Sequence, residues 1–98
     1  MQTAPPIPVT IAAQALELAQ RPYTAVVKRI TDDSGTYYHA SVLELDGCQT
    51  TGDTMQEIGD HLQEAILLWI ETSLVDGDAI PMPLDRDDIG RIMRARAG

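Results

Sequence analysis

The sequence predicts an α+β fold built as one small domain. Residues 23–30 and 36–45 are rich in β-forming side chains and are separated by the turn-forming segment TDDSG, which is typical of a β-hairpin. Residues 54–76 then repeat apolar side chains every three or four positions, as a helix packed on a sheet does. A chain of 98 residues without Phe allows one modest core of aliphatic side chains.

The N-terminal part is predicted to be an extension with a short helix. Residues 11–20 follow helical spacing, with Thr10 as the candidate N-cap. Pro22 disfavours helical geometry at Arg21, so the helix should end before the first strand. The resulting division is an extension with a short helix (1–21), a central domain (22–84) and a short arginine-rich tail (85–98), in which residues 87–98 could form a brief helix.

The central domain should continue from the hairpin into a third strand and, much later, a fourth. Asp46-Gly47 has turn chemistry, with Gly47 as a structural residue, and residues 48–51 could form a short strand. Residues 78–84 are predicted as a short edge strand, because their prolines cannot donate to a ladder.

The long helix has the clearest local signals in the chain. Thr54 and Glu57 fit a capping box, in which the threonine caps the helix and the glutamate reaches back to its backbone N–H. Gly77 should end the helix in the left-handed conformation. One stripe of apolar residues faces the core, with Trp69 as its anchor: Met55, Ile58, Leu62, Ala65, Ile66 and Trp69.

A second apolar set lies off this stripe, at Leu67, Ile70 and Leu74. Two interpretations stay open. The set could pack against the N-terminal helix, or it could form the seam with a partner protein or with another copy in a homo-oligomer (dimer or tetramer).

Composition restricts the function. The net charge is −8, with −9 in residues 1–80 and +1 in the remainder, which disfavours a nucleic-acid footprint over the body. A single cysteine, Cys48, rules out an internal disulfide and a cysteine-based zinc site. No signal-peptide pattern begins the chain, and the apolar run 65–70 is too short to span a bilayer, so we expect a cytoplasmic protein without a membrane association.

Residues with catalytic chemistry are few and scattered. His39 stands alone on a strand, His61 lies near carboxylates on the helix, and Cys48 has no recognisable base beside it, so it is expected to be structural. We therefore predict no catalytic residues, no metal site and no cofactor, and the protein is expected not to be an enzyme.

Several motifs in order resemble the HicB-like antitoxin family. They are YTAVV at 23–27, EL at 44–45, GC at 47–48, GDT at 52–54, EA at 64–65, DG at 76–77 and IPMP at 80–83. The resemblance implies a β-β-β-α-β domain in two layers, like a truncated ribonuclease H fold, with a mixed sheet and one long helix on it. It also implies an antitoxin that binds and blocks HicA, a small basic ribonuclease.

The resemblance leaves two functions open. The first is a HicB-like antitoxin that neutralises a HicA-like toxin. The second is a stand-alone oligomeric domain with a structural or small-ligand-binding role. Complete antitoxins of the family usually carry a C-terminal DNA-binding domain, and the residues after Pro83 are too few to form one, so DNA binding is not expected.

Overall fold

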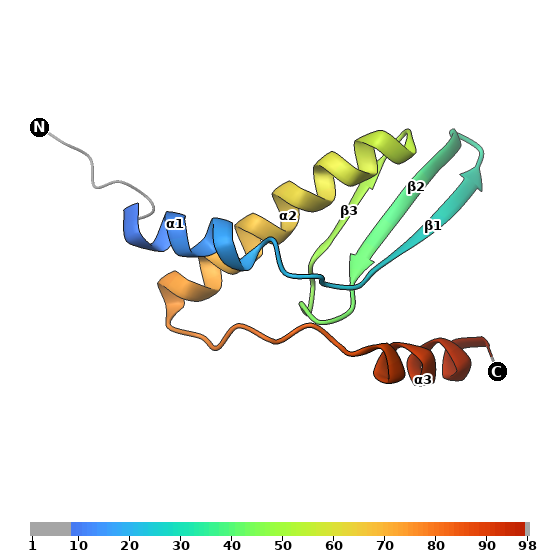
Figure 1. Ribbon diagram of the computed structural model, residues 1–98. Coiled ribbons are helices and arrows are strands. Elements are labelled where there is room, and N and C mark those ends of the chain that lie inside the picture. Colours follow the sequence, from blue (N-terminus) through green and yellow to red (C-terminus); the bar gives the residue numbers. More distant parts are fainter. Residues whose placement is uncertain (1–8, 98) are drawn as a thin grey trace, which may run out of the picture.

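The computed structural model describes residues 9–97, which form a three-stranded sheet and three helices (Figure 1). The predicted α+β class and the short N-terminal helix are confirmed. In chain order the elements are α1 (Val9–Leu18), β1 (Ala25–Asp32), β2 (Gly35–Val42), β3 (Gln49–Gly52), α2 (Met55–Asp76) and α3 (Arg86–Ala97). Thr10 lies inside α1, so its prediction as the N-cap is wrong.

The sheet is antiparallel, in the order β1-β2-β3. Asp32 pairs with Gly35 across a two-residue turn, and Ala25 pairs with Val42 at the other end of the hairpin. The Asp32 carboxylate accepts the Ser34 N–H at 2.9 Å, which is the local bond expected of a turn aspartate. Gly35 follows at a φ of 124°, which is open to glycine because it has no side chain.

The predicted fourth strand is wrong, and with it the mixed sheet. Within residues 9–97 the segment 78–84 pairs with no strand, and all the observed pairing is antiparallel. Pro81 and Pro83 remove two N–H donors from this short segment, which leaves little to build a ladder. The likeness to a truncated ribonuclease H fold, which needs that strand, is not confirmed.

Side-chain bonds hold the segment in place instead. The Glu44 carboxylate accepts the backbone N–H of Leu84 at 2.9 Å and that of Thr24 at 2.8 Å. The Tyr23 hydroxyl donates to the carbonyl of Pro81 at 2.7 Å. The chain after α2 is therefore fastened to the start of β1 by two side chains rather than by a ladder.

Both ends of α2 form as predicted, with one difference in detail. The Thr54 hydroxyl accepts the Glu57 N–H at 3.1 Å, and Gly77 ends the helix at a φ of 77°. The Gly77 N–H bonds to the Leu74 carbonyl and the next N–H bonds to the Ser73 carbonyl, which is a Schellman motif. The Glu57 carboxylate reaches back to the N–H of Asp53 rather than to that of Thr54.

The core has two parts that share α2. In the first, Ala15 and Ala19 of α1 pack on Ile70. In the second, Val42, Leu45 and Cys48 are buried against the sheet side of α2. Helix α2 covers β2 and β3 but not β1, which therefore forms an open edge of the molecule (Figure 1).

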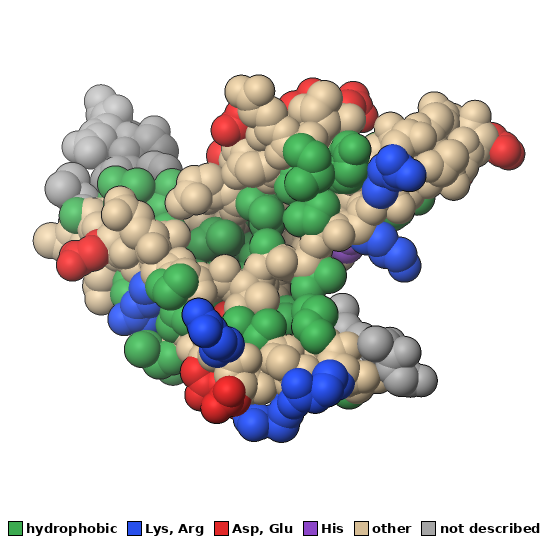
Figure 2. Space-filling view, turned by 45° about the vertical axis from the view of Figure 1, so that its right-hand side comes forward, with side chains coloured by type: hydrophobic (Ala, Val, Ile, Leu, Met, Phe, Trp, Pro, Cys, Tyr) green, Lys and Arg blue, Asp and Glu red, His purple; other side chains and the backbone are tan. Residues whose placement is uncertain are grey.

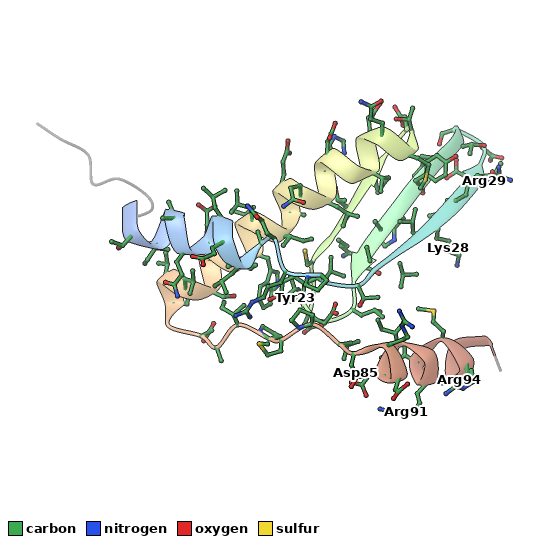
Figure 3. The ribbon with its side chains drawn as sticks, viewed as in Figure 1. Tyr23, Lys28, Arg29, Asp85, Arg91 and Arg94 are labelled. Carbon is green, nitrogen blue, oxygen red and sulfur yellow. The ribbon has the colours of Figure 1, made fainter. Side chains whose placement is uncertain are left out.

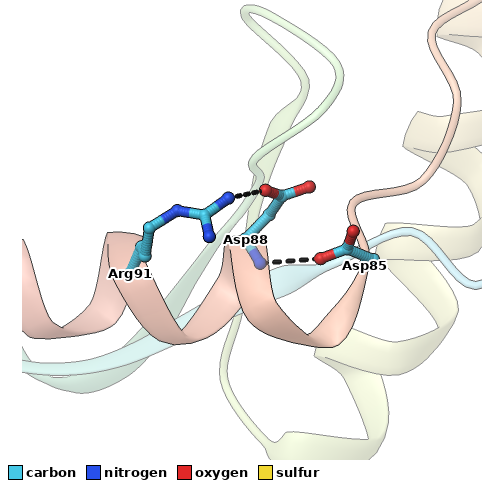
Figure 4. Close-up of polar contacts among 3 residues, drawn as sticks. All are labelled: Asp85, Asp88 and Arg91. Carbon is cyan, nitrogen blue, oxygen red and sulfur yellow. Dashed lines mark hydrogen bonds and ion pairs between the residues drawn. The ribbon is translucent and has the colours of Figure 1, made fainter.

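Helix α3 stands apart from the rest of the described chain (Figure 1). Asp85 caps its start by accepting the Asp88 N–H at 2.7 Å, and Asp88 in turn pairs with Arg91 (Figure 4). The structure confirms the brief helix predicted for this segment. It also shows what the sequence did not indicate, which is that the helix lies away from the core.

Candidate functional site

The predicted seam residues lie between two helices of the same chain. Ile70 is fully buried with Ala15 and Ala19, and half-buried Leu67 and Leu74 pack against that cluster. The structure thus has the packing against the N-terminal helix that the sequence allowed. A role of these residues in binding another chain stays a prediction.

The turn that the sequence marks as structural is bound tightly to α2. Gly47 adopts a φ of 80°, in the left-handed region that favours glycine. Cys48 is buried beneath the turn. The Trp69 indole N–H donates to the carbonyl of Asp46 at 2.8 Å, so this half-buried ring links the helix to the turn and packs on both core clusters.

A groove of about 380 Å³ opens where this turn meets α2. Its walls include Cys48 from the turn and Ala65, Leu68 and Trp69 from the helix. The side chain of Leu68 is 64% exposed. An apolar groove with an exposed leucine at its margin is typical of a site that receives an apolar side chain of a partner protein.

The helix that forms one wall of the groove is strongly acidic. Helix α2 contains no Lys or Arg, and its five acidic residues are Glu57, Asp60, Glu64, Glu71 and Asp76. Glu64 and Glu71 are the residues four before and three after Leu68, so they flank it on the helix surface. The groove therefore combines apolar walls with a negative margin.

Sequence reasoning did not identify Leu68. It lies off both apolar stripes of the helix, and an apolar residue off a stripe counts for little by itself. The signal that could have identified it is its position between Glu64 and Glu71. An acidic helix face points to solvent, so a leucine on that face is not explained by packing in the core.

A second cleft, of about 390 Å³, is polar and lies at the turn end of the sheet. Tyr37, Asp53, Glu57 and His61 are among the residues that line it. His61 Nδ1 donates to the Thr51 carbonyl at 2.6 Å, and this bond raises the pKa of the imidazole. Desolvation opposes the increase, and the charges of Glu57, Glu64 and Asp60 add to it.

The remaining reactive groups are occupied in structural roles. Burial raises the pKa of the Cys48 thiol, which disfavours the thiolate that a nucleophile needs. His39 bonds to the Gln49 side chain at 3.0 Å. Within residues 9–97, no three His, Cys, Asp or Glu side chains lie close enough together to hold a metal ion.

Comparison with known proteins relates the chain to one family. Residues 23–93 match the family described as "HicB_like antitoxin of bacterial toxin-antitoxin system". The chain belongs to the HicB-like antitoxin family. It is also 34% identical to the UPF0150 protein ssr1765 of Synechocystis sp. over 59 residues, which are 60% of this chain and 71% of that protein. No solved structure matches it significantly.

The HicB-like match includes the turn, the groove and α2, and it extends into α3. Among the described residues, no helix is long and apolar enough to cross a membrane. Membership of the family indicates a role in a toxin–antitoxin system, so the groove and its acidic margin are the natural candidates for a surface that meets a toxin.

Proposed function

We propose that this chain is a non-enzymatic antitoxin that neutralises a small basic ribonuclease of the HicA type by binding it on α2. The observation that carries the proposal is the apolar groove at Leu68 and Trp69, whose helical wall, α2, contains no Lys or Arg. The family indicates that the partner is a toxin, and the charge of this face selects a basic protein.

The two components of this face have different tasks. Complementary charge speeds the encounter of the two proteins and disfavours wrong partners, but it contributes less to the final affinity. An apolar side chain of the toxin that enters the groove would contact Leu68 and Trp69 and exclude water there. Buried apolar anchors of this kind supply most of the binding energy of an interface.

The remaining reactive side chains of the protein are consistent with inhibition by binding alone. Cys48 is buried and the two histidines are hydrogen-bonded within the fold, so we assign no catalytic role to them. The toxin acts on mRNA, and we therefore place the complex in the cytoplasm, where the reduced thiol of Cys48 is also expected.

Rescue of toxin-arrested cells tests the proposal. The toxin should be the product of a gene beside the one for this chain, and its induction should stop growth unless the chain is co-expressed. Glu64→Lys with Glu71→Lys should abolish the rescue. The matched control, Asp33→Lys with Asp78→Lys, changes the charge equally at exposed positions outside α2 and should rescue as the wild type does.

A second candidate is a stand-alone oligomeric domain with a structural or small-ligand-binding role and no toxin partner. The polar cleft lined by Tyr37 and His61 favours it, because a cleft of about 390 Å³ is large enough for a small ligand. This function predicts a stable oligomer that binds no HicA-like protein, and a thermal shift with polar metabolites that His61→Ala removes.

A further inference from the structure

The outer edge of β1 is a row of free backbone groups. The Leu43 N–H donates to the Thr24 carbonyl at 2.9 Å, so the even-numbered residues of this strand bond inward to β2. Alternation along an antiparallel strand then directs the N–H and C=O groups of the odd-numbered residues, 25 to 31, away from the sheet. Among residues 9–97, no strand pairs with that edge.

Of the usual protections of an exposed edge, this strand has only charged side chains, at Lys28, Arg29 and Asp32. It is eight residues long and contains no proline, whereas many exposed edges are also short, covered or interrupted. Val27 is 38% exposed, and Met93 of α3 is 36% exposed. Figure 2 shows a hollow between the sheet and α3, with hydrophobic side chains gathered beside it. Free backbone hydrogen-bonding groups and exposed apolar side chains thus both favour the binding of another strand at this edge.

The charge around the edge is the reverse of that on α2. Lys28 and Arg29 project from β1, and Arg91 and Arg94 point away from the sheet on α3 (Figure 3). Six of the seven basic residues of the chain lie in these two elements. A basic toxin would be repelled here, so the occupant should carry acidic groups that can meet Lys28 or Arg29.

We propose that β1 of a second copy of this chain pairs antiparallel with this edge, centred on Ile30. In that register Lys28 lies opposite Asp32 of the second copy, and the same pair forms again across the two-fold axis. The outward-facing Arg29 and Thr31 then form the hydrogen-bonded pairs. The inference goes beyond the proposed function and does not depend on it.

The alternative registers are less favourable. Centring the pair on Lys28 or on Arg29 places like charges directly opposite each other, which is destabilising. Centring it on Val27 places Lys28 opposite Val26 and gains no ion pair. The charge pattern of KRITD at 28–32 therefore makes the strand complementary to itself in one register.

The proposed dimer leaves the toxin-binding face free. The two-fold axis of an antiparallel strand pair stands perpendicular to the sheet, so both copies present α2 on the same face of a continuous six-stranded sheet. Ala25 and Val27 are paired with buried Val42 and Ala40, so the odd-numbered residues of β1 lie on the face that α2 covers. Lys28, Ile30 and Asp32 alternate with them and lie on the opposite face. One surface can then bind the toxin while the edge holds the second copy.

The mass of the full chain in solution, measured by analytical ultracentrifugation, tests the pairing. Arg29→Pro removes one outward N–H and no bond to β2, and Arg29→Ala is the matched control that keeps the N–H. We expect a dimer for the wild type and for Arg29→Ala, and a folded monomer for Arg29→Pro. A wild-type monomer, or an oligomer that Arg29→Pro leaves intact, would overturn the proposal.

A charge exchange tests the register. Lys28→Asp and Asp32→Lys should each weaken the dimer by about tenfold or more, since each loses two cross-strand ion pairs and creates repulsion. The double variant should restore the dimer. Circular dichroism checks that each variant is folded, because Asp32 also bonds to Ser34. Folded single variants without an effect, or a folded double variant that stays monomeric, would refute the centring on Ile30. Arg29→Pro should still rescue toxin-arrested cells, because the toxin-binding face is separate from the edge. This measurement therefore distinguishes a failure of the dimer proposal from a failure of the antitoxin proposal.

Discussion

Glu44 binds the backbone of Leu84, 40 residues away, at 2.9 Å. The same carboxylate accepts the N–H and the hydroxyl of Thr24. One side chain thus joins the turn after β2 to the start of β1 and to the segment that leads into α3. It takes the place of the ladder that the sequence predicted there.

Replacing Glu44 by Gln should destabilise the fold by about 2 kcal/mol, because an amide cannot accept all the bonds made by the carboxylate. Urea unfolding measures the loss, with Glu17→Gln on the exposed side of α1 as the control. An unchanged midpoint for Glu44→Gln would contradict the role given to this residue.

The stabilisation by Glu44 should depend on pH. Burial disfavours the charged form, but the bonds from Leu84 and Thr24 outweigh this and lower the pKa below its ordinary value of 4.5. The contribution is therefore complete above about pH 4.5 and is lost as the pH falls through the lowered pKa. The difference in unfolding free energy between wild type and Glu44→Gln should shrink between pH 5 and pH 2, about the range over which such carboxylates titrate.

His61 should have the opposite dependence. Its bond to the Thr51 carbonyl and the nearby carboxylates raise the pKa above 6.5. The stabilisation is present below the unfolded-state value and is lost as the pH rises through the raised pKa. NMR titration of the imidazole gives the pKa directly. His61→Ala should be less stable than wild type at pH 5.5 and closer to it at pH 8, about one unit or more to either side of the ordinary value.

Trp69 should contribute through both packing and its indole N–H. Trp69→Phe keeps most of the packing but loses the bond to Asp46, at about 1 kcal/mol. Trp69→Ala also loses the ring that packs on both core clusters, and because the ring is half-buried we expect about 2–4 kcal/mol in chemical unfolding. Equal effects of the two substitutions would mean that the packing is unimportant.

The sequence predicted the elements whose determinants are local. Thr54 and Gly77 bound α2 as their capping chemistry requires, and the two-residue turn before Gly35 forms the hairpin. These caps and turns depend on a few neighbouring residues, so a single sequence is enough to predict them. The family motifs were recognisable for the same reason, since most of them are turns and caps.

The errors arose where distant residues decide. Residues 78–84 have a composition compatible with an edge strand, but Glu44 and Tyr23 hold them in another conformation. The groove at Leu68 also escaped prediction, because it exists only where the turn at Cys48 approaches α2. Neither relationship is visible in the spacing of residues along the chain.

The central claim is that α2 binds a basic toxin, and calorimetric titration of the purified chain with the HicA-like product of the neighbouring gene tests it most directly. We expect stoichiometric binding that weakens with salt. Glu64→Lys with Glu71→Lys should lower the affinity at least about a hundredfold, because the reversal places like charges opposite each other, and this repulsion costs far more than the original attraction contributes. Asp33→Lys with Asp78→Lys should bind nearly as the wild type does. No heat of binding, or equal affinities for the two double variants, would contradict the account.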